Sequence, residues 1–103
     1  MKKIKLSIGL FDKDTKKQQI DTFNAVQLIE KTLIAVGAAG LSVYTGNGVY
    51  VHDDGTLVRE PSVFVDIYNL PNEELEKAIV FLKKELNQES IAVESSTVNV
   101  KFL

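Results

Sequence analysis

Apolar residues recur along this chain with two different periods in turn. A period of two residues is that of a strand, and a period of about 3.6 residues is that of a helix. Residues 3–11 alternate strictly, which is typical of a strand with one buried face. Helical spacing follows over 22–36 and again over 72–86, and alternating segments come after each stretch. The order predicts an α+β, ferredoxin-like βαββαβ two-layer sandwich: an antiparallel four-stranded sheet with two helices on one face.

The 103 residues are predicted to form a single domain, 1–103, because this length suits one core and no linker or repeat interrupts it. A net charge of −2 makes nucleic acid an improbable partner, since nucleic-acid binders usually carry a basic excess. The chain has no cysteine, which excludes disulfides and thiolate metal sites. No motif predicts a cofactor or a metal.

The N-terminal apolar run ends too early for a secretory signal. It extends from Leu6 to Phe11, is interrupted by Ser7 and Gly9, and has no small-residue cleavage site after it. No segment approaches the roughly 20 apolar residues of a membrane span. We therefore expect a cytoplasmic protein without a membrane partner.

Glycines indicate how the central hairpin is built. Gly46 and Gly48 interrupt a strand that starts at Leu41, which indicates a bulge or a close backbone approach. A bulge is favoured over a phosphate-binding loop, because the third glycine and the strand-to-helix context of such a loop are missing. A three-residue turn with Gly55 in the left-handed conformation pairs Val51 with Leu57. We prefer this register because it keeps the apolar residues of both strands on one face.

Other local signals concern helix starts and the last strand. Asp21 or Thr22 can cap the first helix, and Asn72 is expected to cap the second. The apolar parity changes between Val93 and Val98, which predicts that the last strand is bulged or split at Ser95–Ser96.

Polar residues gather at one end of the predicted sheet, where strands one and two end and strands three and four begin. They are Asp12, Lys13, Asp14, His52, Asp53, Arg59, Glu60, Gln88, Glu89 and Ser90. Acids, bases, amides and one histidine together suit a small polar ligand or acid–base chemistry. The alternative is that these are ordinary polar loops and that His52 only flanks a hairpin. A metal held by His52, Asp53 and Asp54 matches no specific ligand spacing.

The face of the sheet away from the helices is predicted to carry aromatic residues. Strand parity places five of the eight aromatic side chains there: Phe11, Tyr44, Tyr50, Phe64 and Tyr68. Exposed apolar patches commonly mark association or ligand sites. The alternative is that the C-terminal residues 97–103 fold over this face.

Several short motifs resemble a known family. They are Gly46-x-Gly48-x-Tyr50, Asp54-Gly55, Arg59-Glu60-Pro61-Ser62, Gln88-Glu89-Ser90-Ile91 and a terminal Val-x-Val-x-Phe pattern. In this combination the chain resembles, from about Leu6 to Phe102, a family of small bacterial and phage α+β proteins without an assigned activity. The resemblance singles out Arg59, Glu60, Ser62, Gln88, Glu89 and Ser90, and it supplies no catalytic residue.

These observations predict a small, non-catalytic binding or assembly module. It would form a homo-oligomer such as a homodimer through the open sheet face. It would bind a protein partner or a small polar ligand near His52, Arg59, Glu60, Ser62 and Gln88–Ser90. A phage or mobile-element accessory protein that binds a host protein belongs to this class. The alternative is a small dimeric ferredoxin-like enzyme with a pocket near His52, Arg59 and Glu60.

Overall fold

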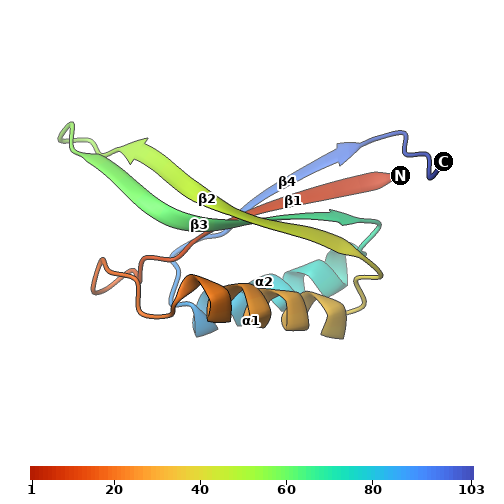
Figure 1. Cartoon of the computed structure of the whole chain (residues 1–103), viewed down its shortest axis with the longest axis horizontal. Coiled ribbons are helices and arrows are strands. Elements are labelled where there is room, and N and C mark those ends of the chain that lie inside the picture. Colours follow the sequence, from red (N-terminus) through yellow and green to blue (C-terminus); the bar gives the residue numbers. More distant parts are fainter.

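Two helices cover one face of a four-stranded antiparallel sheet in the computed structural model, which describes residues 1–103 (Figure 1). The elements are β1 (Lys2–Gly9), α1 (Thr22–Ala35), β2 (Leu41–Val51), β3 (Leu57–Tyr68), α2 (Asn72–Glu85) and β4 (Ala92–Thr97). The strands lie in the order β2-β3-β1-β4. This arrangement confirms the predicted βαββαβ fold.

The core lies between the sheet and the helix layer. Strand β1 occupies an inner position, and its inward side chains Ile4, Leu6 and Ile8 are fully buried. The predicted helical stripes face these side chains, with buried residues in α1 at Ala25, Ile29 and Leu33 and in α2 at Leu75, Ala78 and Leu82. The opposite side of the sheet has no layer over it, and we call it the open face.

The β2–β3 hairpin has the predicted register. Val51 pairs with Leu57 and Tyr44 with Phe64, and Gly55 has a φ of 86° in the turn. The register places even-numbered residues of β3 on the open face and odd-numbered residues on the helix side, because side chains alternate along a strand. That parity decides which residues can reach a site on the open face.

The bulge predicted at Gly46 and Gly48 is wrong. The two strands pair without interruption, with Gly46 opposite Ser62 and Gly48 opposite Glu60. A Cβ atom added at Gly46 would lie 3.2 Å from the Phe64 ring, and one added at Gly48 would lie 3.2 Å from the Ser62 hydroxyl. These glycines therefore allow a close approach of cross-strand side chains, the other reason for glycine within a strand.

The two helices begin in different ways. Asp21 is the N-cap of α1 and accepts a 2.8 Å hydrogen bond from the Asn24 amide. The cap predicted for α2 is wrong, because Pro71 occupies the N-cap position and makes no side-chain hydrogen bond there. Asn72 is instead the first helical residue, and its side chain accepts a hydrogen bond from the Lys2 ammonium group.

Strand β4 pairs with β1 without the irregularity expected at Ser95–Ser96. Ser95 lies opposite Ile4 and Ser96 opposite Lys3, and the strand ends at Thr97. Figure 1 shows β4 rising away from the helix layer. No helix covers the end of this strand, so its side chains are exposed and can be polar. The change of apolar parity marks the end of the strand.

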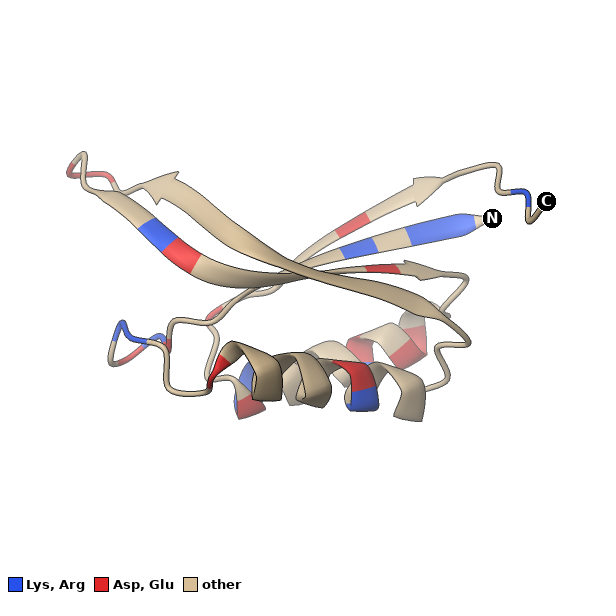
Figure 2. Ribbon diagram, in the orientation of Figure 1, with Lys and Arg blue, Asp and Glu red and all other residues tan.

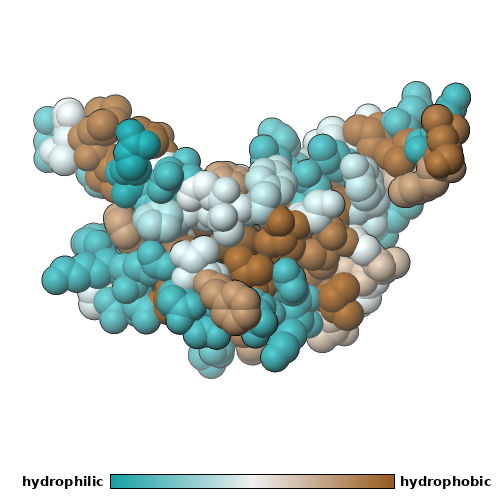
Figure 3. All heavy atoms as spheres, in the orientation of Figure 1, coloured by the Kyte–Doolittle hydropathy of each residue, from teal (hydrophilic) through white to brown (hydrophobic).

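Both ends of the sheet extend beyond the core. The tip of the β2–β3 hairpin exposes Val49, Val51 and Leu57, and the C-terminal tail exposes Phe102 and Leu103. Figure 3 shows these apolar atoms at opposite ends of the molecule, whose longest dimension is 45 Å. Because Phe102 is 85% exposed, the tail does not pack over the aromatic residues of the open face.

Charged residues of both signs are interspersed on the sheet and on the helices (Figure 2). Lys3 and Lys5 alternate with the buried residues of β1 and therefore lie on the open face. None of the helices has the length and apolar character required to cross a membrane.

Candidate ligand-binding site

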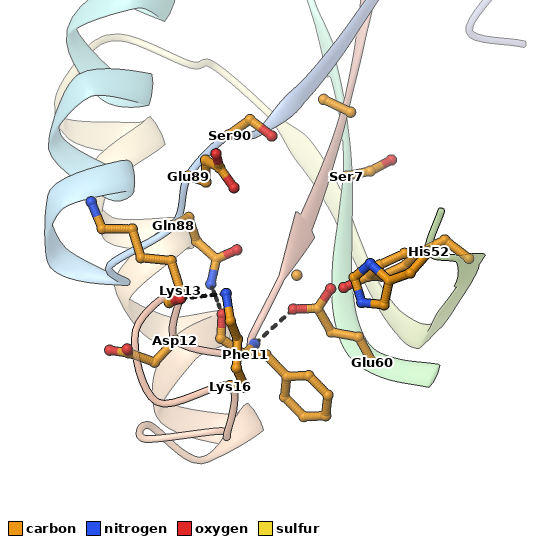
Figure 4. A pocket seen from close by; sticks show the side chains of 13 residues that line it. Ser7, Phe11, Asp12, Lys13, Lys16, His52, Glu60, Gln88, Glu89 and Ser90 are labelled. Carbon is orange, nitrogen blue, oxygen red and sulfur yellow. Dashed lines mark hydrogen bonds between the residues drawn. The ribbon is translucent and has the colours of Figure 1, made fainter. Parts of the chain in front are cut away.

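A cavity of about 500 Å³ lies on the open face, at the end of the sheet where β1 and β2 end and β3 and β4 begin (Figure 4). This is the end at which the strand order was expected to gather polar residues. Its lining residues are Ser7, Gly9, Phe11, Asp12, Lys13, Lys16, Tyr50, His52, Glu60, Gln88, Glu89, Ser90 and Ala92.

The Glu60 carboxylate is held on the sheet side of the cavity by a backbone amide. One oxygen, Oε2, accepts a 2.8 Å hydrogen bond from the Phe11 amide, while Oε1 has no donor from the protein. The Lys77–Glu74 pair is the sole salt bridge of the chain, so no basic nitrogen lies within 4.0 Å of a Glu60 oxygen, although Lys13 and Lys16 line the same cavity. Figure 4 shows the carboxylate directed across the sheet toward the Phe11 backbone. Glu60 is therefore an oriented, half-buried anion with a free oxygen.

Aromatic side chains border this carboxylate. Tyr50 and His52 follow each other on the open face at the end of β2, and their rings pack edge to face with centroids 5.3 Å apart. Phe11 lies just beyond β1 and forms an isolated bridge with Gln18. Aromatic rings beside a carboxylate provide both a stacking surface and an attraction for a positive charge.

The segment after α2 forms the opposite side of the cavity. Gln88 is buried, and its Nε2 donates a 2.7 Å hydrogen bond to the Phe11 carbonyl oxygen. Phe11 is thus held at both backbone groups, by Glu60 at its N–H and by Gln88 at its C=O. Glu89 and Ser90 follow Gln88 and are exposed at the cavity rim.

A hydrogen-bonded loop shapes the remaining rim. The Asp12 carboxylate accepts from the amides of Asp14 and Thr15 at 2.9 and 3.0 Å and from the Asn87 side chain at 2.9 Å. The Thr15 amide, followed by the Asn87 side chain, lowers the pKa of Asp12 below its ordinary value of 3.8. Lys16 donates to the Lys13 carbonyl oxygen. The loop is therefore ordered by its own polar groups.

The structure brings together most, but not all, of the predicted ligand residues. His52, Glu60, Gln88, Glu89 and Ser90 line the cavity. Ser62 is buried beside it, and its hydroxyl donates to the Glu60 carbonyl oxygen at 3.1 Å.

Arg59 is separated from the cavity by strand parity. It occupies an odd position of β3, opposite Val49, so its exposed side chain extends from the helix-side face of the hairpin. The predicted pocket near His52, Arg59 and Glu60 therefore forms without Arg59. Adjacent residues of an extended strand cannot both face the same side of a sheet.

Two backbone contributors were missed by sequence reasoning. Gly9 lies where a Cβ atom would be 2.5 Å from the Glu60 carboxylate, and Phe11 contributes its amide in addition to its ring. A glycine in an alternating strand signals a close approach, which was a usable clue for Gly9. The role of the Phe11 amide has no signature in the sequence, since every non-proline residue carries that group.

The aromatic residues of the open face divide into separate groups. Tyr44 and Phe64 stack with ring centroids 5.5 Å apart, and Lys5 Nζ lies 5.8 Å from the Phe64 ring centre. Phe11 and Tyr50 instead belong to the cavity, and Tyr68 lies at the far end of β3. The face thus combines a central stacked pair with a polar cavity.

Comparison with solved structures finds the same fold in several proteins. A phage SAM lyase in complex with S-methyl-5′-thioadenosine matches with a TM-score of 0.66 and 23% identity, over 92% of this chain and 79% of that chain. CutA from Synechococcus elongatus matches with a TM-score of 0.60 and 15% identity, over 94% of this chain and 75% of that chain. The periplasmic divalent cation tolerance protein CutA from Archaeoglobus fulgidus matches with a TM-score of 0.60 and 8% identity, over 99% and 88%.

No family model and no curated protein sequence matches the chain. At these identities the structural matches establish a shared ferredoxin-like fold. They leave the chemistry of the cavity to be argued from its own residues.

Proposed function

We propose that the protein binds a small adenosyl sulfonium compound, of the S-adenosylmethionine class, in the Glu60 cavity. The observation that carries this proposal is the Glu60 carboxylate, held by the Phe11 amide beside aromatic rings and without a salt-bridge partner. Such an anion favours a ligand that has its own positive charge.

The chemistry of a sulfonium ligand fits this arrangement. Its positive sulfur can approach both a carboxylate and the faces of aromatic rings, and its adenine can stack on an aromatic side chain. The cavity of about 500 Å³ lies in the usual range for small-molecule sites. Tyr50 and His52 supply the rings on one side, and Gln88 and Ser90 supply hydrogen-bonding groups near the other.

The structural comparison independently suggests this ligand class. The phage protein that shares the fold over 92% of this chain is a SAM lyase and holds S-methyl-5′-thioadenosine. Its phage origin also supports our proposal that the present chain is a phage or mobile-element accessory protein. We propose that it acts in the cytoplasm, where such metabolites are abundant.

Calorimetry with S-adenosylmethionine and S-methyl-5′-thioadenosine tests the binding. Glu60→Gln keeps an acceptor for the Phe11 amide but removes the charge. We expect it to weaken binding of the sulfonium by about 10- to 100-fold, the effect of losing a charged contact. The neutral thioether should lose much less affinity, because it carries no positive charge.

Glu94→Gln is the matched control for that substitution. Glu94 lies on the open face of β4 and outside the cavity, so its removal should leave binding unchanged. Equal losses in both variants, or a wild-type protein that binds neither compound at millimolar concentration, would contradict the proposal.

A product assay distinguishes a binding module from an enzyme that uses the same cavity. Incubation with S-adenosylmethionine, followed by chromatography, shows whether S-methyl-5′-thioadenosine accumulates in proportion to protein. Accumulation that Glu60→Gln abolishes would establish the alternative of a lyase. Binding without product would leave the non-catalytic module.

A second proposal concerns self-association through the open face. It is supported by the stacked pair Tyr44–Phe64, whose Tyr44 is 43% exposed and has no covering layer. Phe64→Asp should shift the sedimentation coefficient of the protein toward that of a monomer. Phe23→Asp, at an exposed position on α1, is the control and should leave the assembly unchanged. A monomeric wild-type protein would contradict this proposal.

A further inference from the structure

Gly9 lies directly beneath the Glu60 carboxylate on the open face. A Cβ atom built at Gly9 would be 2.5 Å from Cδ, Oε1 and Oε2 of Glu60, far inside van der Waals contact. We propose that Gly9 is a positioning residue, which keeps the space that the Glu60 carboxylate must occupy to face the ligand. The inference rests on the proposed function, since it explains how the anion of that cavity is held.

The backbone at Gly9 has no need of glycine for its own conformation. Gly9 is the last residue of β1, pairs with Ser62, and is not among the glycines with positive φ, which are Gly37 and Gly55. Any L-residue can adopt an extended conformation there. The requirement for glycine therefore comes from Glu60 alone.

The steric conflict at Gly9 differs in kind from an ordinary packing clash. The three atoms that a methyl group would meet most closely all belong to the far end of a flexible side chain. Glu60 can turn outward toward solvent at little cost to the fold. Gly9→Ala is thus expected to move the carboxylate while leaving the sheet intact.

The hydrogen-bond donor that receives Glu60 would stay in place after this substitution. The Leu10 amide donates to the Pro61 carbonyl oxygen at 3.0 Å, and the Phe11 carbonyl accepts from Gln88 at 2.7 Å. These bonds fix the peptide on either side of the Phe11 amide. The substitution therefore separates the anion from a donor that is otherwise unchanged.

The Phe11 amide reports the position of Glu60 without any ligand. In the wild-type protein the hydrogen bond to Glu60 Oε2 should protect the Phe11 amide proton from exchange with solvent. Glu60→Ala should abolish that protection, which assigns it to the Glu60 hydrogen bond. Gly9→Ala should abolish it as well, with the rest of the amide spectrum retained.

Gly40→Ala is the matched control, because nothing lies within 4 Å of a Cβ there and its φ is not positive. It should keep the exchange protection of the Phe11 amide and the affinity for S-adenosylmethionine. Gly9→Ala should weaken that affinity about as much as Glu60→Gln, by roughly 10- to 100-fold. Combining the two should cause no further loss, because both act on the same carboxylate.

Unchanged exchange protection of the Phe11 amide in Gly9→Ala would overturn the inference, and so would failure of this variant to fold. Failure of the proposed function looks different: the wild-type protein would then not bind S-adenosylmethionine. In that case the exchange protection of the Phe11 amide alone decides whether Gly9 positions Glu60.

Discussion

The Asp12 carboxylate shows how one residue can order the rim of the cavity. Its hydrogen bonds lower its pKa in the folded protein, chiefly through the Thr15 amide. A carboxyl group with a lowered pKa stabilises the fold at pH values above its ordinary 3.8. That stabilisation is lost as the pH falls through the pKa of the folded state.

Asp12→Asn is expected to lower the free energy of unfolding at neutral pH, because the ionised acceptor is removed. The difference from wild type should shrink below about pH 4 and vanish once both states are protonated. Urea denaturation at a series of pH values measures this. Asp53→Asn, at a carboxylate that accepts no hydrogen bond from the protein, is the control; an equal effect there would contradict the role of the Asp12 bonds.

Residue chemistry alone could identify which polar side chains were candidates, but not how they are held. Glu60 was selected from its place near the start of a strand, and the structure adds that it meets the Phe11 amide. Arg59 was selected with it and lies on the other face. The Arg59-Glu60-Pro61-Ser62 motif contains both residues as neighbours in sequence. Because side chains alternate along a strand, the two lie on opposite faces of the sheet.

At the scale of secondary structure, the helix starts give a direct comparison. Asp21→Ala should reduce the free energy of unfolding by about 1 kcal/mol, the usual cost of an N-cap. Asn72→Ala should cost less than about 0.5 kcal/mol, because Asn72 makes only an exposed contact with Lys2. Thermal or urea denaturation measures both. Equal losses would show that Asn72 acts as a cap after all.

Apolar periodicity predicted the elements correctly where they pack against the core. The predictions were wrong where the strands extend beyond the core. Helical spacing predicted helices over 22–36 and 72–86, and α1 and α2 occupy Thr22–Ala35 and Asn72–Glu85. The irregularities expected at Gly46–Gly48 and at Ser95–Ser96 are absent. At both places the strands run beyond the helix layer, so burial no longer determines which residues alternate (Figure 1).

At the scale of the whole molecule, the ferredoxin-like βαββαβ fold was the most informative prediction. Antiparallel neighbours in the order β2-β3-β1-β4 bring the ends of β1 and β2 to the starts of β3 and β4. The cavity is found there. Its depth and the uncovered hairpin tip depend on the curvature of the sheet, which no local pattern in the sequence encodes.

The Phe11 peptide connects two distant parts of the chain. Its N–H is bound by Glu60 from the middle of the sequence, and its C=O by Gln88 from the segment after α2. The site therefore exists only when the N-terminal, central and C-terminal segments have all come together. No isolated fragment can carry it, and occupancy of the cavity becomes a measure of global folding. A ligand bound there would raise the melting temperature of the entire chain, because it has no partial structure to bind.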